Sequence, residues 1–151
     1  MKPKIIKLER EASVNYPIGD NIANVTKTCA DMAKQLKGIY PAKSTLKFYV
    51  RGSSGAIMGA IISTMIPECE IIICHVKKEG EDSHSGGQVS RCENIQAPSI
   101  IIDDFIITGS TIKAIYEAMG VEVDTLCVSG QVVRSELPFE PKHIICGSCI
   151  I

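Results

Sequence analysis

The order of apolar and polar residues along the chain predicts strands that alternate with helices. Between residues 21 and 37, apolar side chains recur at steps of three and four, which is the period of one helix face. We expect Asp20 to cap the start of this helix and Gly38 to lie beyond its end. Five apolar runs predict strands at 46–50, 70–76, 99–103, 124–129 and 143–151.

Two of these strands lead through a short loop into a helix. The first, 46–50, runs through a loop of Gly and Ser into a helix that ends near Ile66. The second, 99–103, leads into a helix at 110–119, with Gly120 just past its end. The same strand, loop and helix unit therefore occurs twice.

The whole chain, residues 1–151, is expected to form one α/β domain. Apolar strands that alternate with helices predict a three-layer sandwich around a mostly parallel sheet. Right-handed crossovers would place the loops that follow the strands along one edge of the sheet, where α/β proteins bind ligands.

Composition and charge narrow the classes of partner. The chain is 45% apolar and 22% charged, and its 16 basic and 17 acidic side chains leave a net charge of −1. No overall field therefore favours nucleic acid or an anionic membrane. The longest internal apolar stretch, 56–62, is far shorter than the ~20 residues of a membrane-spanning helix, and charges interrupt the N-terminus where a secretory signal would be apolar. We therefore expect a cytoplasmic protein.

The cysteines and histidines suggest no metal centre. Seven cysteines, an odd number scattered through strand and helix segments, favour reduced and buried thiols over a disulfide framework. Cys146 and Cys149 form a single Cys-x-x-Cys, but no second pair has the spacing of a zinc site, so we interpret them as strand thiols. His75 and His143 stand at strand ends and are interpreted as structural.

The segment from 99 to 111 carries the strongest chemical signal. It joins a buried strand to two adjacent acids, Asp103 and Asp104, and then to a hydroxyl-rich turn that opens a helix. A phosphate at that turn would meet unpaired backbone N–H groups and the positive end of the helix, and Gly109 would permit close approach. The carboxylates can only accept hydrogen bonds, which suits the vicinal hydroxyls of a ribose. The segment therefore predicts a ribose 5-phosphate site; the alternatives are a generic phosphate-binding turn and a solvated acid pair.

This segment resembles the signature of the type I phosphoribosyltransferases, which bind 5-phosphoribosyl-1-pyrophosphate (PRPP). That signature has four apolar residues, two acids, a short apolar stretch and Thr-Gly-x-Thr, and the resemblance covers roughly residues 46–129. It implies that Asp103 and Asp104 are catalytic residues that hold the ribose hydroxyls. It also implies a cradle for the 5-phosphate made of Ile107, Thr108, Gly109, Ser110 and Thr111.

A second segment resembles the pyrophosphate loop of this family. The residues Arg51, Gly52, Ser53 and Ser54 follow the strand at 46–50, where family members often have a strained or cis peptide that turns backbone N–H groups toward the ligand. The peptide between Arg51 and Gly52 would have that function here. The alternative is an ordinary turn of Gly and Ser.

A third segment, 77–94, is unusually long and polar for a loop in a compact domain, which favours a functional loop. It is similar to the catalytic loop of orotate phosphoribosyltransferases, which carries a basic pair, then Glu and a later His. The resemblance implies that Lys77, Lys78 and His84 are catalytic residues that close over the site and neutralise charge on departing pyrophosphate. The alternative is a solvated surface loop.

The sequence departs from the family where the acceptor base binds. Hypoxanthine–guanine enzymes carry Asp at the position of Ile107, so a 6-oxopurine is disfavoured. Few residues precede the first helix, so the hood that covers the base in orotate enzymes is expected to be reduced. The candidates for a hood are the N-terminal segment and 130–142, where Arg134 and Phe139 could face a base.

The resemblance implies a pentosyltransferase that moves the 5-phosphoribosyl group from PRPP to a nitrogenous base, with release of pyrophosphate. The loop resemblance favours a pyrimidine such as orotate over adenine as the base. The expected cofactor is Mg²⁺, held mainly by PRPP, with Asp103 and Asp104 as the candidate protein ligands. The expected partners are PRPP and a nucleobase, and the expected assembly is a homodimer, since dimers are common in the family. The alternative is a regulatory protein of the same fold that binds PRPP or a nucleotide without turnover.

Overall fold

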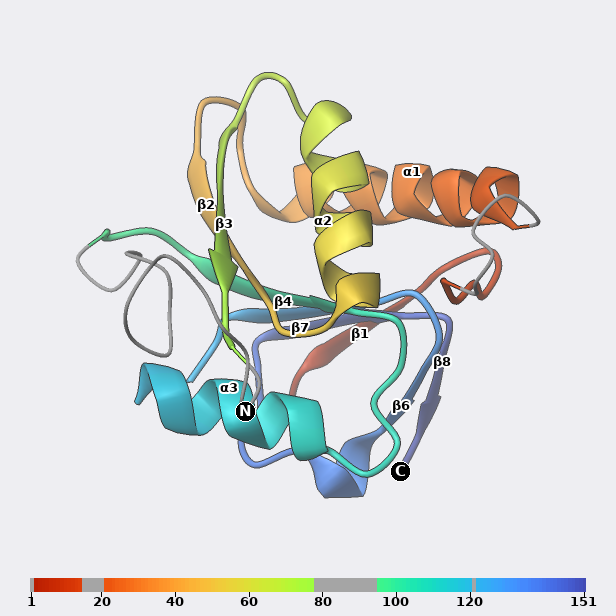
Figure 1. Ribbon diagram of the computed structural model, residues 1–151, viewed down its shortest axis with the longest axis vertical. Helices are drawn as coiled ribbons and strands as arrows, with labels where there is room; N and C mark the ends of the chain where they lie inside the picture. Colours follow the sequence, from red (N-terminus) through yellow and green to blue (C-terminus); the bar gives the residue numbers. More distant parts are fainter. Residues whose placement is uncertain (1, 15–20, 78–94, 121) are drawn as a thin grey trace.

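The computed structural model describes residues 2–14, 21–77, 95–120 and 122–151 (Figure 1). Its helices are α1 (Ile22–Ile39), α2 (Ser53–Thr64) and α3 (Ser110–Met119), and a short 3-10 helix, η2, covers Arg134–Glu136. Its strands are β1 (Lys4–Lys7), β2 (Thr45–Val50), β3 (Glu70–His75), β4 (Ser99–Asp103), β5 (Thr125–Val128), β6 (Gln131–Val133), β7 (His143–Cys146) and β8 (Ser148–Ile150).

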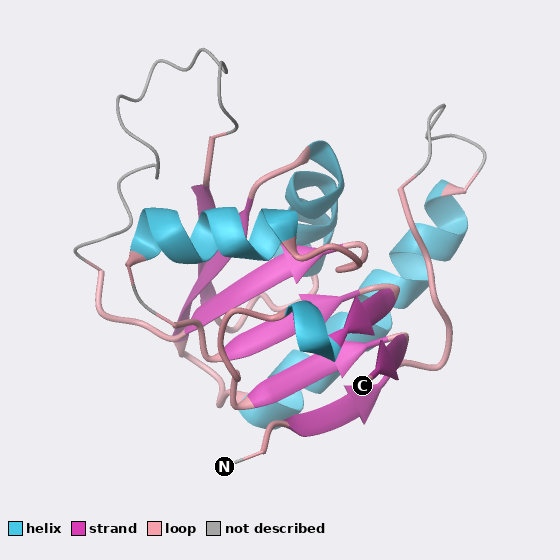
Figure 2. Cartoon of the chain, turned by 90° about the horizontal axis from the view of Figure 1, so that it is seen from below, coloured by secondary structure: helices cyan, strands magenta, loops and turns pink. Residues whose placement is uncertain are grey.

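Six strands form one sheet in the order β1-β7-β5-β4-β2-β3, and every neighbouring pair is parallel. The helices α1 and α2 cover one face of this sheet and α3 covers the other (Figure 1). Figure 2 shows α3 lying across the strands when the molecule is seen from below. The predicted α/β sandwich is confirmed. Because the strands are parallel, their carboxyl ends meet at one edge, where the expected binding loops begin.

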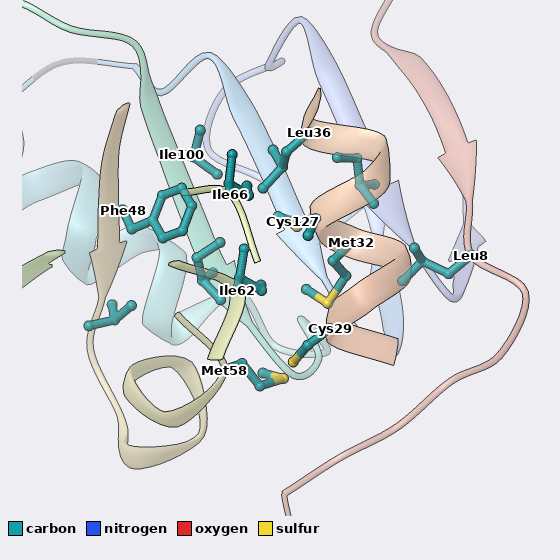
Figure 3. Packing of buried hydrophobic residues seen from close by; sticks show 14 of the residues in the cluster. Leu8, Cys29, Met32, Leu36, Phe48, Met58, Ile62, Ile66, Ile100 and Cys127 are labelled. Atoms are coloured by element: carbon teal, nitrogen blue, oxygen red, sulfur yellow. The ribbon is translucent and has the colours of Figure 1, made fainter. Parts of the chain in front are cut away.

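The side chains of β4 alternate between two hydrophobic clusters. Ile100 and Ile102 pack in the cluster with α1 and α2, where Met32 and Phe48 are also fully buried (Figure 3). Ile101 packs in the opposite cluster, with α3. A parallel strand that is covered on both faces has no polar side, so its sequence is a continuous run of apolar residues. This is why the sequence alone predicted β4 correctly.

The first helix ends later than its glycine predicted. Gly38 lies inside α1 rather than beyond it. The helix stops because Tyr40 is extended, with φ −111° and ψ 129°, as favoured in a residue that precedes proline, here Pro41. The N-cap predicted at Asp20 lies outside the described residues.

The last predicted strand is in fact two strands, β7 and β8, which belong to different sheets and are separated by Gly147. The Gly147 N–H donates to the carbonyl oxygen of Gly130 at 2.9 Å, which turns the chain out of the main sheet. The strands β1 and β6 were not predicted from the sequence. Both are short, and β1 is mostly exposed, so neither produces an apolar run.

The cysteines are mostly free, as predicted. Cys74 is disulfide-bonded, so the prediction of reduced thiols is wrong for this residue. An odd number of scattered cysteines argues against a disulfide framework but leaves room for one isolated bridge. The cysteines with free thiols in the described part of the chain are Cys29, Cys69, Cys127, Cys146 and Cys149.

Two searches of the described ranges gave no candidates. No helix there has both the length and the apolar character that crossing a membrane requires. Nor do three or more His, Cys, Asp or Glu side chains gather there in an arrangement that could hold a metal ion.

Candidate functional site

A crevice is expected between the carboxyl ends of β2 and β4. These strands are neighbours in the sheet, yet the chain leaves them toward opposite faces. The helix after β2, α2, packs in one hydrophobic cluster, and the helix after β4, α3, packs in the other. In open α/β sheets, ligands bind where two neighbouring connections diverge in this way. The loops that follow β2 and β4 flank this position.

The acid pair lies at the carboxyl end of β4. Asp103 and Asp104 are both half-buried. The backbone N–H of Asp104 donates to Asp103 Oδ1 at 2.8 Å, and the backbone N–H of Phe105 donates to Asp104 Oδ1 at 3.0 Å. The backbone N–H of Ser129 donates to the carbonyl oxygen of Asp103 at 3.1 Å, which ties this corner to β5. The local backbone therefore orients both carboxylates at the edge of the sheet.

The loop after the acid pair is fixed by its middle residue, Ile106. Its N–H donates to the carbonyl oxygen of Gln131, and its carbonyl oxygen accepts from the N–H of Val133, both at 2.8 Å. Ile106 is buried against β6, whereas its neighbours Phe105 and Ile107 are 49% and 43% exposed. The loop therefore presents two large apolar side chains on the ligand side of the sheet edge.

The turn that opens α3 surrounds a small hollow of about 130 Å³. The first backbone hydrogen bond of the helix runs from the N–H of Lys113 to the carbonyl oxygen of Gly109 at 2.9 Å. The first turn contains no acidic residue and receives no side-chain cap from Gly109, so no carboxylate of that turn competes for its positive end. Hydroxyl-bearing residues line the hollow: Thr108, Ser110 and Thr111. An anion is the ligand that this arrangement suits.

Gly109 is required by the fold itself as well as by the expected ligand. Its backbone is left-handed, with φ 78°, and a Cβ built there would lie only 2.5 Å from the carbonyl oxygen of Glu136 in η2. The sequence predicted that this glycine lets a phosphate approach. The structure adds that the backbone of η2 occupies the space that a side chain at position 109 would need.

The loop after β2 lies on the other side of the crevice. Gly52 is the N-cap of α2, whose first turn also lacks a side-chain cap and an acidic residue. The Nε atom of Arg51 is buried and has no hydrogen-bond partner among the described residues. A buried donor without a partner is unfavourable, so an acceptor from an anionic ligand would stabilise it. Gly52 has ordinary extended dihedrals, φ −103° and ψ 176°, so the expected strain is not seen there; the cis peptide stays a prediction.

The start of α2 lies directly against β4. A Cβ built on Gly55 would be only 2.6 Å from the carbonyl oxygen of Ile102, the residue before the acid pair. The absence of a side chain at Gly55 therefore lets the first turn of α2, which contains Ser53 and Ser54, pack closely against the end of β4. Residues that are far apart in the sequence therefore lie at the same edge of the sheet; their common role in one site stays a prediction.

A segment from the N-terminus, residues 8–14, crosses the carboxyl ends of β7 and β5; we call it the strap. The N–H of Leu8 donates to the carbonyl oxygen of Cys146 at 2.8 Å, and the N–H of Ala12 donates to that of Ser129 at 3.3 Å. The hydroxyl of Ser129 donates in turn to the carbonyl oxygen of Ala12. The strap is thus anchored next to the acid pair; it is one of the two segments that the sequence named as candidates for a reduced hood.

A second hollow, of about 530 Å³, opens between the strap, the start of α1 and the loop after β4. Phe105 and Ile107 line both hollows, so the two adjoin at these side chains. The larger hollow is lined by Glu11, Ala12, Ser13, Asn21, Asn24, Asp104, Phe105, Ile107, Gly130 and Gln131.

The residues predicted from the catalytic-loop resemblance are only partly described. Lys77 is half-buried and follows β3 at the same edge of the sheet. Lys78 and His84 lie outside the described residues, and their predicted roles stay predictions.

Two residues predicted to face a base do not line the larger hollow. Phe139 is buried and stacks on Tyr116, with ring centroids 5.3 Å apart. Arg134 pairs with Glu140, with Nη2 and Oε1 at 3.0 Å. Neither side chain therefore lines this hollow, because Phe139 packs against α3 and Arg134 pairs with Glu140; a role of either in base binding stays a prediction.

Sequence reasoning missed the polar residues of the larger hollow. Glu11, Asn21, Asn24 and Gln131 form no local motif, since they come from the strap, α1 and β6. The only signal was that the N-terminal segment and 130–142, which contain Glu11 and Gln131, were named as the candidates for a hood.

Comparisons with known proteins gave matches of structure only. No protein-family model matches the sequence, and no curated protein matches it significantly. A hypoxanthine phosphoribosyltransferase from Staphylococcus aureus is 18% identical, with 96% of this chain aligned to 80% of that chain at a TM-score of 0.57. A hypoxanthine-guanine phosphoribosyltransferase from Bacillus anthracis is 9% identical, with coverages of 95% and 83% and a TM-score of 0.59. An adenine phosphoribosyltransferase from Thermoanaerobacter pseudethanolicus is 19% identical, with coverages of 89% and 84% and a TM-score of 0.61.

Proposed function

We propose that this chain, which has the fold of the phosphoribosyltransferases, is a pentosyltransferase that moves the 5-phosphoribosyl group from PRPP to a nucleobase and releases pyrophosphate. The observation that carries the proposal is that three parts follow the carboxyl ends of the neighbouring strands β2 and β4. These parts are the acid pair after β4 and the starts of α3 and α2, both of which lack an acidic residue in the first turn. A sugar phosphate with a second phosphate group is the ligand class that uses all three.

Each part of PRPP has a matching group in the crevice. The 5-phosphate would bind in the small hollow, against the first N–H groups of α3 and the hydroxyls of Thr108 and Ser110. The ribose hydroxyls would donate to Asp103 and Asp104. The pyrophosphate would bind at the start of α2, beside the unpaired Nε of Arg51.

The residues present also fit Mg²⁺. Carboxylate oxygens are the ligands that Mg²⁺ prefers, and one oxygen of each acid of the pair accepts from the next backbone N–H, which holds the carboxylates in place. Asp103 and Asp104 would hold the ion together with oxygens of PRPP. When bound, the ion would offset negative charge on the departing pyrophosphate.

In the proposed reaction the bond from C1 to the pyrophosphate oxygen breaks, and a bond from C1 to a base nitrogen forms. Positive charge builds on the sugar ring as the leaving group departs, and the acid pair would balance this charge. Lys77, at the same edge, would face the negative charge that develops on pyrophosphate. Ile107 cannot accept the proton that the base loses, so that proton must pass to another group or to solvent.

The acceptor would bind in the larger hollow, which adjoins the phosphate hollow at Phe105 and Ile107. The proteins of similar structure are named for hypoxanthine, guanine and adenine. The preference for orotate rests on a loop that lies mostly outside the described residues and stays a prediction. The homodimer and the cytoplasmic location also stay predictions.

The proposal is tested by calorimetric titration of PRPP with Mg²⁺ into the wild type and into the double variant Asp103→Asn with Asp104→Asn. We expect the variant to bind PRPP roughly tenfold or more weakly, because each lost charge-assisted hydrogen bond to a hydroxyl weakens the complex. Glu117→Gln is the matched control: this exposed carboxylate on α3 lines neither hollow, so its loss should leave affinity unchanged. Equal affinity of the double variant and the wild type would remove the acid pair from the site.

Turnover is measured separately, as pyrophosphate release in the presence of a panel of nucleobases. Release that depends on one base supports the transferase. PRPP binding without release for any base supports the alternative, a regulatory protein of this fold.

A further inference from the structure

We infer that the acceptor carries no negative charge and is an uncharged heterocycle that donates a hydrogen bond to Glu11. This inference rests on the proposed function, because it concerns the hollow beside the proposed ribose site. Two residues with carboxylate side chains, Glu11 and Asp104, are among the residues that line this hollow. No lysine, arginine or histidine lines it within the described part of the chain.

The strap holds Glu11 in a defined place even though its side chain is exposed. The next residue, Ala12, is anchored to Ser129 by hydrogen bonds in both directions. The carbonyl oxygen of Glu11 itself accepts from the Asn24 side chain at 3.5 Å. The stem of Glu11 lies over Gly147, where a Cβ would overlap it. Glycine at the boundary of β7 and β8 thus makes the room that lets Glu11 form one wall of the hollow.

The remaining walls suit a flat, uncharged ring. Phe105 and Ile107 offer apolar surface, and Gln131 and Asn24 carry amides that can donate or accept. The Nδ2 of Asn21 donates to the carbonyl oxygen of Ser13, which ties the start of α1 to the strap and closes that side of the hollow. A nucleobase combines an apolar face with polar edges, so it matches both kinds of wall.

Charge then decides between classes of base. Two like charges a few ångströms apart near a protein surface repel strongly enough to weaken binding on the order of a hundredfold. The carboxylate of orotate would lie near Glu11 without a cation among the described lining residues to offset that charge. Asp104 adds little to this repulsion when it holds the proposed Mg²⁺. An amino group or a ring N–H, in contrast, would find a charged acceptor in Glu11. The hollow therefore opposes the orotate acceptor that the loop resemblance suggested.

The experiment measures base binding in a complex that cannot react. The full chain is saturated with ribose 5-phosphate, Mg²⁺ and pyrophosphate, and the dissociation constants of adenine, uracil and orotate are measured by equilibrium dialysis. Uracil and orotate share a ring and differ by the carboxylate, so their ratio isolates the charge. The variants are Glu11→Gln and Glu11→Lys, with Glu9→Gln as a control on the same segment whose side chain does not line the hollow.

We expect adenine or uracil to bind the wild type at least roughly tenfold more tightly than orotate. This ratio is smaller than the full effect of the repulsion between like charges described above. Glu11→Lys should narrow or reverse this preference, Glu11→Gln should reduce it, and Glu9→Gln should leave it unchanged. Orotate that binds as tightly as the neutral bases, no binding of any of the three, or an unchanged ratio in Glu11→Lys would each overturn the inference, provided that ribose 5-phosphate binds. Failure of ribose 5-phosphate to bind would instead overturn the proposed function, and the inference with it.

Discussion

Two reasons were given for a glycine at the start of α3: the close backbone of η2 and the approach of a phosphate. Substitution of Gly109 by alanine tests both. Gly109 and Gly120 stand at opposite ends of the same helix with nearly the same backbone, φ 78° and ψ 5° against φ 69° and ψ 9°. A Cβ at Gly120 meets no atom within 4 Å in the described part of the chain, whereas a Cβ at Gly109 lies 2.5 Å from the carbonyl oxygen of Glu136. The pair therefore differs in steric contact and little else.

The expected magnitudes follow from this difference. An alanine in the left-handed region costs about 1–2 kcal/mol, and both variants carry this penalty. Both also reduce the entropy of the unfolded chain by the same amount, so this effect cancels between them. Gly109→Ala must in addition displace the backbone of η2, and overpacking of this kind costs about 1–3 kcal/mol. We expect it to lower the free energy of unfolding by about 2–4 kcal/mol, against about 1 kcal/mol for Gly120→Ala.

The assay is urea unfolding followed by circular dichroism, together with titration of PRPP with Mg²⁺ into each folded variant. Displacement of η2 also moves the turn that forms the phosphate hollow, so Gly109→Ala should weaken PRPP binding, whereas Gly120→Ala should not. Equal destabilisation by the two substitutions would refute the steric reasoning. A stable Gly109→Ala variant with unchanged PRPP affinity would refute the assignment of this turn to the phosphate as well.

Three further predictions concern packing and titration. Gly55→Ala should destabilise the protein by about 1–3 kcal/mol, since its Cβ would lie 2.6 Å from the carbonyl oxygen of Ile102, and chemical unfolding measures this. Burial raises the pKa of Cys29 from 9.0 to about 12, which lowers its thiolate fraction on the order of a thousandfold. The half-buried Cys69 should therefore react with iodoacetamide far sooner than Cys29, and peptide mapping after timed alkylation measures this. Burial, and to a smaller extent two nearby lysines, lowers the pKa of His143 below 6.5. Its contribution to the free energy of unfolding is therefore present above pH 6.5 and is lost as the pH falls through the pKa of the folded state. An NMR titration that gave a pKa of 6.5 or more for His143 would contradict this.

The sequence by itself determined the elements whose signals are local. The run from Ser99 to Thr111 was predicted correctly because both faces of β4 are covered, which leaves an uninterrupted apolar strand before the acid pair. The hydroxyl turn and its glycine also follow within a few residues, so the prediction of a phosphate site there depends on local residues alone. A turn after the apolar strand at 46–50 was likewise predicted, but it is shorter than expected, because Ser53 and Ser54 already belong to the first turn of α2.

Only the tertiary structure decided what surrounds that local motif. The strap is positioned by pairing of β1 with β7, and β1 is too short and too exposed to leave an apolar pattern. Its position brings Glu11 to Gln131, residues from opposite ends of the chain, and so sets the charge of the larger hollow. The need for glycine at Gly109 likewise depends on η2, which is distant in sequence. Contacts of this kind are made between elements rather than within them, so no periodicity or spacing along the chain records them.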